Sequence, residues 1–98
     1  MIRYEVTLEV DQKSADALER YMRGEHIPEI FRSGCFRRIH FNRASNSRCR
    51  TSYEAESQAK LDRYLDYYAP RLRADFQARF GSGITITRET WTPIEIWE

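Results

Sequence analysis

The sequence predicts an α+β domain whose elements follow the order strand, helix, strand, strand, helix, strand. Apolar and polar side chains alternate strictly from Ile2 to Val10, as in a strand with one buried and one polar face. Two later segments carry apolar side chains three and four residues apart, which is the spacing of an amphipathic helix. Of the 98 residues, 41% are hydrophobic, which is enough for one core, so we expect a single domain over residues 1–98.

The first helix is expected over about residues 14–31. Gly24 and the step from Ile27 to Pro28 interrupt its pattern, because the residue before a proline is pushed out of the α region. We therefore predict a kink or a second short helical turn with Pro28 at its first position, and a helix end at Ser33–Gly34.

Residues 35–43 and 48–56 are strand-like and are separated by a segment of turn composition, which predicts a hairpin. If Ile39 lies opposite Tyr53, alternation assigns each side chain to one face. The inward set is then Cys35, Ile39, Phe41, Cys49, Thr51, Tyr53 and Ala55, and the outward set is Phe36, Arg38, His40, Arg48, Arg50, Ser52 and Glu54.

This pairing sets Cys35 and Cys49 about eight residues apart along the strands, or roughly 26 Å. A disulfide needs Cα atoms within about 7 Å, so two free thiols and no metal site are expected, as in a reducing compartment. No apolar run approaches the roughly 20 residues of a membrane span. The expected location is the cytoplasm.

Ser57 is expected to cap a second helix, which Pro70 bends or divides. Its apolar stripe is Leu61, Tyr64, Leu65, Tyr68, Leu72, Phe76 and Phe80. A last strand is expected over residues 84–92, and Ile94 and Ile96 suggest a short further strand. The resulting βαββαβ order is that of a ferredoxin-like sandwich, a four-stranded antiparallel sheet with two helices on one face.

Several short motifs in this order and spacing resemble those of a small bacterial family known as domain of unknown function 4286. They are Glu25–Glu29, Gly34–Phe36, Tyr64–Arg73 and Phe80–Gly81. The family is similar in organisation to the dimeric α+β barrel superfamily, in which two ferredoxin-like subunits pack their open sheet faces together and each holds a ligand pocket between helices and sheet. Members include cofactor-independent monooxygenases, isomerases, haem enzymes and regulatory ligand-binding domains. The resemblance implies a homodimer, but it supplies no catalytic residue.

The outward side chains of the expected sheet are strongly charged, with Arg3, Glu5 and Glu9 on the first strand and three arginines on the hairpin. A buried interface would require these charges to pair. A solvated sheet face would have the same composition. Dimerisation through the open face is therefore an expectation that rests on the resemblance.

His26 is the candidate catalytic residue. It lies beside the expected helix break, where its imidazole could enter the cleft between helix and sheet and act as a general base near neutral pH. The alternative is a structural histidine that hydrogen-bonds the free carbonyl groups of the break.

Arg37, Tyr53 and Tyr68 are the candidate ligand-binding residues. Arg37 and Tyr53 are expected on the inward face of adjacent strands, and Tyr68 on the helix stripe above them. A guanidinium beside phenolic hydroxyls would bind the carboxylate or oxyanion of a small anionic or aromatic ligand. Alternatively, Arg37 reaches solvent or pairs with Glu56, and the aromatic side chains are core.

The net charge of +1 argues against strong attraction to nucleic acid, although the hairpin is rich in arginine. RNA-binding sheets stack bases on exposed aromatic side chains of their central strands, and the outward positions of residues 2–10 and 48–56 hold none. Nucleic acid is therefore not expected as a partner. No cofactor is expected, and a haem is disfavoured because His40 lies on the face opposite His26.

The leading hypothesis is a homodimeric small-molecule-binding domain, with a cofactor-independent monooxygenase- or isomerase-like activity as one form of it. An apolar-lined cavity of about 300 Å³ or more that reaches His26 would support it, and a helix-to-sheet interface packed solid would contradict it. The alternative is a non-catalytic dimerising or regulatory domain with an arginine-rich hairpin. The residues alone do not name a substrate.

Overall fold

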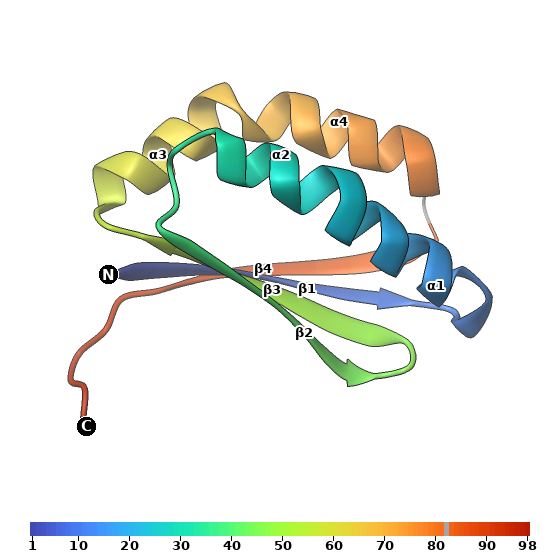
Figure 1. Ribbon diagram of the computed structural model, residues 1–98, viewed down its shortest axis with the longest axis horizontal. Coiled ribbons are helices and arrows are strands. Elements are labelled where there is room, and N and C mark those ends of the chain that lie inside the picture. The colour runs from blue at the N-terminus through green and yellow to red at the C-terminus, as the bar shows by residue number, and fades with distance from the viewer. Residues whose placement is uncertain (82) are drawn as a thin grey trace.

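The computed structural model describes residues 1–81 and 83–98 and has two layers, a twisted sheet and a helical layer that covers one of its faces (Figure 1). The strands are β1 (Ile2–Val10), β2 (Arg38–Ser45), β3 (Arg48–Ala55) and β4 (Ile84–Trp91). They are ordered β2-β3-β1-β4, and every neighbouring pair is antiparallel. The predicted ferredoxin-like βαββαβ fold is confirmed.

The helical layer consists of two broken helices. The elements are α1 (Gln12–Tyr21), η1 (Met22–His26) and α2 (Ile27–Arg32), followed after the hairpin by α3 (Gln58–Tyr67) and α4 (Ala69–Phe80). Asp11 caps α1 by accepting a hydrogen bond from the Ser14 N–H at 3.0 Å, and Ser57 caps α3 by accepting one from the Lys60 N–H at 3.2 Å.

The break in the first helix is a π-helical turn. The N–H of Ile27 donates to the carbonyl of Met22, five residues earlier, where an α-helix would bridge four. Pro28 follows at once and has no N–H to continue the α pattern. The interruption predicted from Gly24 and Pro28 is thus confirmed, and His26 is the last residue of the wide turn.

The second helix is divided just before Pro70, as predicted. Tyr68 has φ −112° and ψ −42°, which ends α3 and starts α4 at a new angle. Gly81 ends α4 with φ +64°, in the left-handed region that glycine adopts without steric cost.

Ile39 lies opposite Tyr53, as predicted, so the two faces of the hairpin follow the expected alternation within the strands. However, β2 begins at Arg38, three residues later than expected. Cys35 and Phe36 precede it in a loop that buries both side chains, which are 3% and 4% exposed. The predicted outward position of Phe36 was therefore wrong, because alternation holds only where the backbone is extended.

Both cysteines are free, as expected.

Residues 92–98 form no strand, so the short strand expected at Ile94 and Ile96 was wrong. None of the helices in the described part of the chain is both long enough and apolar enough to span a membrane.

The core lies between sheet and helices and divides into two clusters. The first contains Tyr4, Ile30, Cys35, Phe36, Tyr53, Ala55, Leu61, Tyr64, Ala69 and Leu72. The second, at the other end of the sheet, contains Leu8, Val10, Leu18, Met22 and Phe76. Val6 packs against both clusters and marks their boundary.

Candidate functional site: a cavity between α4 and β4

A cavity of about 90 Å³ lies at the boundary of the two core clusters. Its inner wall includes three tyrosines, Tyr4, Tyr53 and Tyr64, together with His26. The cavity reaches His26, so the interface is not packed solid, but its volume is smaller than the roughly 300 Å³ that would support the small-molecule hypothesis. The observed volume equals about three water molecules at roughly 30 Å³ each, so it admits a small molecule or the end group of a larger one.

The imidazole of His26 is held in the cavity wall by aromatic side chains. Its ring centroid lies 5.6 Å from that of Tyr21 and 5.5 Å from that of Phe76. Burial lowers the pKa of His26, and the nearby carboxylates of Glu29 and Asp75 only partly oppose this effect. The imidazole is therefore neutral near pH 7.

The Nδ1 atom of His26 is buried and has no hydrogen-bond partner within the described residues. The structural alternative, in which His26 satisfies carbonyl groups at the helix break, thus leaves this nitrogen unused. A buried nitrogen without a partner is costly to stability, so Nδ1 itself does not hold His26 in place.

The tyrosines supply neutral hydroxyl groups. Burial raises the pKa of both Tyr53 and Tyr64, so each stays protonated throughout the physiological range. Tyr4 packs 5.8 Å from Tyr53 between ring centroids, and its hydroxyl accepts a hydrogen bond from Nη2 of Arg73 at 3.1 Å. The ring wall is therefore linked directly to a cation at the surface.

The mouth of the cavity is lined by Arg73 and Gln77 from α4 and Arg88 from β4, whose side chains are all exposed. Arg88 is opposite Val6 in the sheet register and so lies on the helix-covered face. Within residues 1–81 and 83–98, neither arginine has a carboxylate partner, and no aspartate or glutamate lines the cavity. The mouth therefore favours an anion.

The structure brings His26 and Tyr53 together at this cavity, but not the other two predicted residues. Tyr68 is half-buried at the junction of α3 and α4 and does not line the cavity; Tyr64, one turn earlier, does. Arg37 was expected to point inward, and this was wrong. It precedes β2, its side chain is exposed, and its backbone N–H donates to the carbonyl of Glu54 at 2.8 Å.

Arg73 and Arg88 were missed as candidate residues. The signal for Arg88 was present, because alternation from Ile84 and Ile86 places residue 88 on the same inward face. No comparable signal existed for Arg73. It follows the buried Leu72 on α4, and its place at the mouth depends on how α4 lies over the sheet edge.

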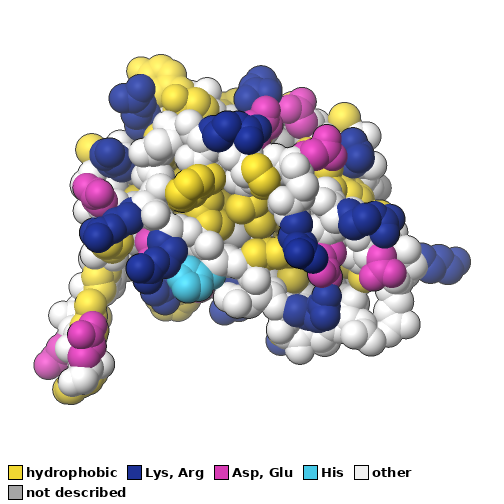
Figure 2. Space-filling model, viewed as in Figure 1, with side chains coloured by type: hydrophobic (Ala, Val, Ile, Leu, Met, Phe, Trp, Pro, Cys, Tyr) yellow, Lys and Arg dark blue, Asp and Glu magenta, His cyan; other side chains and the backbone are white. Residues whose placement is uncertain are grey.

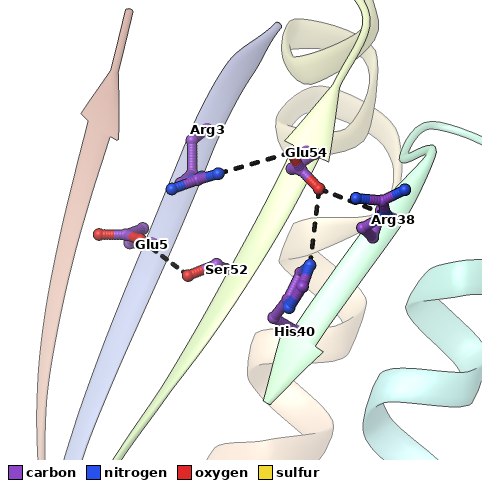
Figure 3. Close-up of polar contacts among 6 residues, drawn as sticks. All are labelled: Arg3, Glu5, Arg38, His40, Ser52 and Glu54. Carbon is purple, nitrogen blue, oxygen red and sulfur yellow. Dashed lines mark hydrogen bonds and ion pairs between the residues drawn. The ribbon is translucent and has the colours of Figure 1, made fainter. Parts of the chain in front are cut away.

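The sheet face without helices, called the open face below, carries paired charges. Glu54 lies between Arg3, Arg38 and His40 at 3.5, 3.8 and 3.8 Å (Figure 3). The Ser52 hydroxyl donates to Glu5 at 2.7 Å. Two further ion pairs complete this face, Arg50 with Glu5 at 3.8 Å and Arg48 with Glu9 at 3.9 Å.

A wider groove of about 730 Å³ lies between α1 and the β2–β3 hairpin. Glu19 binds Arg43 there and lies 3.7 Å from Arg23, so these two cations are already partnered. Basic and acidic side chains are interspersed over the face shown in Figure 2, with hydrophobic side chains exposed near its middle. No cluster of three potential metal ligands occurs in the described ranges.

Structural comparison supports the fold assignment. A candidate antibiotic biosynthesis monooxygenase from Deinococcus radiodurans aligns with a TM-score of 0.77 and 12% identity, covering 100% of this chain and 97% of that one. A dimeric ferredoxin-like protein from an uncultured marine organism aligns with a TM-score of 0.73 and 14% identity, covering 98% and 97%.

A monooxygenase from Streptomyces coelicolor in complex with nanaomycin D aligns with a TM-score of 0.65 and 13% identity, covering 99% of this chain and 92% of that one. At these identities the similarity shows the fold alone. The search of curated proteins finds no match. The family model described as domain of unknown function 4286 matches residues 1–94. The chain therefore belongs to the DUF4286 family.

Proposed function

We propose that this protein is a homodimeric domain that binds a small anionic ligand, or the anionic end of an aromatic ligand, in the cavity between α4 and β4. One observation carries the proposal. Arg73 and Arg88 line the cavity and have no carboxylate partner in the described chain, and the rest of the cavity wall offers neutral donors and no acid. Such a site lowers the energy of an anion and of little else.

The volume limits what enters. A carboxylate, or the oxyanion end of a phenolate or enolate, fits a cavity of about 90 Å³, while a whole benzene ring occupies engineered cavities of about 150 Å³. We therefore assign the inner cavity to the anionic end group. The remainder of the ligand extends past the exposed side chain of Gln77.

His26 gives the site a catalytic form. The neutral imidazole that lines the cavity accepts a proton from the substrate, and the electron pair stays on the substrate as an enolate or phenolate. Arg73 or Arg88 then stabilises that charge. In a monooxygenase-like reaction, dioxygen would be the co-reactant that oxidises the anion.

The second candidate function is a regulatory domain that binds its ligand without changing it. The small volume favours this candidate, because it leaves little room for dioxygen beside a substrate. Turnover of a probe separates the two.

The homodimer is proposed to form through the open face. One structural neighbour is described as a dimeric ferredoxin-like protein, which supports the same assembly for this chain. The outward positions of the four strands hold four arginines and four glutamates, so two copies of the face do not repel each other by net charge. The arginines are Arg3, Arg38, Arg48 and Arg50, and the glutamates are Glu5, Glu9, Glu54 and Glu89.

Binding is tested by calorimetry with 4-hydroxybenzoate, acetate and phenol as probes. We expect the two anions to bind and phenol to bind more weakly. Arg73→Gln and Arg88→Gln should each weaken 4-hydroxybenzoate binding by about tenfold or more, since a charged hydrogen bond contributes about 1.5–3 kcal/mol. Arg63→Gln is the matched control, an exposed arginine of α3 outside the cavity. Equal losses in all three variants would sink the proposal.

Turnover is tested with 1,4-dihydroxynaphthalene and an oxygen electrode. The catalytic form predicts oxygen uptake above the protein-free rate that His26→Gln abolishes while the probe still binds. Uptake at the protein-free rate in both proteins, with binding retained, would support the regulatory domain instead.

A further inference from the structure

Large hydrophobic side chains are exposed at the C-terminal end of the chain. Trp91 is 52% exposed, Ile94 100%, Ile96 70% and Trp97 82%. The described part of the protein has seven exposed large hydrophobic side chains, and these four of them lie within its last eight residues. Single exposed apolar residues are normal, but a run of this kind marks an interaction surface.

This segment leaves the body of the protein on a particular side. Residues 92–98 form no helix or strand and, in Figure 1, run away from the helical layer to the side of the open face. Trp91 is opposite Arg3 in the register, and Tyr4, which is buried under the helices, is opposite Thr90. Trp91 therefore belongs to the open face, and the apolar segment continues from it.

We propose that residues 92–98, called the C-terminal arm below, pack against a second copy of this chain. This inference rests on the homodimer in the proposed function and adds the surface that holds it together. At about 3.3 Å per residue the seven residues reach roughly 23 Å, whereas two packed sheets are separated by about 10 Å. The arm is long enough to cross that gap and to lie along the flank of the partner.

The arm supplies what the open face lacks. The open face has balanced charges but little apolar area, and exposed ion pairs alone contribute only about 0–1 kcal/mol each. Stable interfaces bury about 800 Å² per partner around an apolar centre enriched in tryptophan. In a two-fold dimer each arm lies on the other copy, so Trp97 and its neighbours are buried twice.

Deletion of residues 92–98 is the direct test. The large hydrophobic side chains that the deletion removes, Ile94, Ile96 and Trp97, are 70–100% exposed. The truncated chain should therefore keep its fold, as checked by circular dichroism. By sedimentation, the full chain should be a dimer at micromolar concentration, and the truncated chain should dimerise at least about a hundredfold more weakly. The matched control is the double variant Glu95→Gln, Glu98→Gln, which keeps the apolar residues and should dimerise normally.

The remaining outcomes are distinct. A truncated chain that dimerises as well as the full chain overturns the arm but leaves the homodimer standing. A monomeric full chain overturns both, and the ligand site is then judged by its own binding test.

Fluorescence adds a local measurement. The chain has two tryptophans, so Trp91→Phe leaves Trp97 as the single reporter. Its emission should shift to shorter wavelength as concentration rises through the range in which sedimentation shows dimerisation. An unchanged emission wavelength over that range overturns the arm as a dimer contact.

Discussion

The two faces of the sheet treat arginine in opposite ways. On the open face, each outward arginine lies within 4 Å of a glutamate, and Glu54 alone serves Arg3 and Arg38. At the cavity under the helices, Arg73 and Arg88 have no such partner among the described residues. The first arrangement balances charge within the chain, and the second leaves positive charge available to a ligand.

This difference separates a surface from a site. Paired charges on an exposed sheet cost little and contribute little, because water solvates them almost as well as their partners do. The two guanidinium groups beside the cavity have no carboxylate partner among the described residues, so their charge is not balanced within the chain. The proposed function assigns them to an anionic ligand.

The largest expected effect concerns the covered face. Phe36→Ala should lower the free energy of unfolding by about 3–5 kcal/mol, because the ring is 4% exposed and lies 5.1 Å from Tyr53 and 4.9 Å from Tyr64. Urea unfolding measures the change. Arg48→Ala on the open face is the comparison and should cost less than about 1 kcal/mol. Similar losses in the two variants would contradict the assignment of stability to the covered face.

The next effect concerns assembly. Glu54→Gln removes the carboxylate shared by Arg3, Arg38 and His40, so two unpaired arginines remain on the open face. If this face is the dimer interface, the dissociation constant of the dimer should rise by about tenfold or more, as measured by sedimentation. Glu56→Gln, an exposed glutamate outside the strands, is the control. An unchanged dissociation constant for Glu54→Gln would place the interface elsewhere.

Much of the fold was predictable because its signals are local. Alternation in residues 2–10 depends only on the backbone of one strand. Pro70 interrupts its helix because it lacks an N–H group, whatever tertiary contacts surround it. The register of Ile39 against Tyr53 also followed from alternation within a short hairpin. Local rules failed at the entrance to β2, where a loop rather than a strand carries Phe36 and Arg37.

The candidate site was predicted less completely because it is assembled from distant segments. His26 was found from the helix break beside it, which is a local signal. The cavity itself lies where two core clusters meet, and neither cluster has a boundary that is visible in the sequence. Arg88 could have been found by extending alternation to the last strand, whereas Arg73 needed the three-dimensional position of α4.

A smaller effect is expected from pH. The pKa of His26 is lowered in the folded chain by burial, while in the unfolded chain it is about 6.5. The unfolded state therefore binds more protons between these two values, and stability falls as pH falls below about 6.5. Urea midpoints between pH 7.5 and 5 should show this fall, and His26→Gln should reduce it. His40→Gln retains His26 and should keep that contribution; an equal reduction in both variants would contradict the assignment.

The smallest expected effect is the most informative about the two faces. Arg88→Gln should change the free energy of unfolding by no more than about 0.5 kcal/mol, because the side chain is exposed and lacks an ion-pair partner in the described chain. Arg50→Gln on the open face removes a hydrogen bond to Thr7 and the ion pair with Glu5, and it should cost slightly more. With 4-hydroxybenzoate the order should reverse, since ligand binding stabilises the folded state and Arg88→Gln loses that gain. Urea unfolding with and without the probe measures both effects. If Arg88→Gln destabilises the ligand-free chain more than Arg50→Gln does, Arg88 supports the fold, and the contrast between the faces fails.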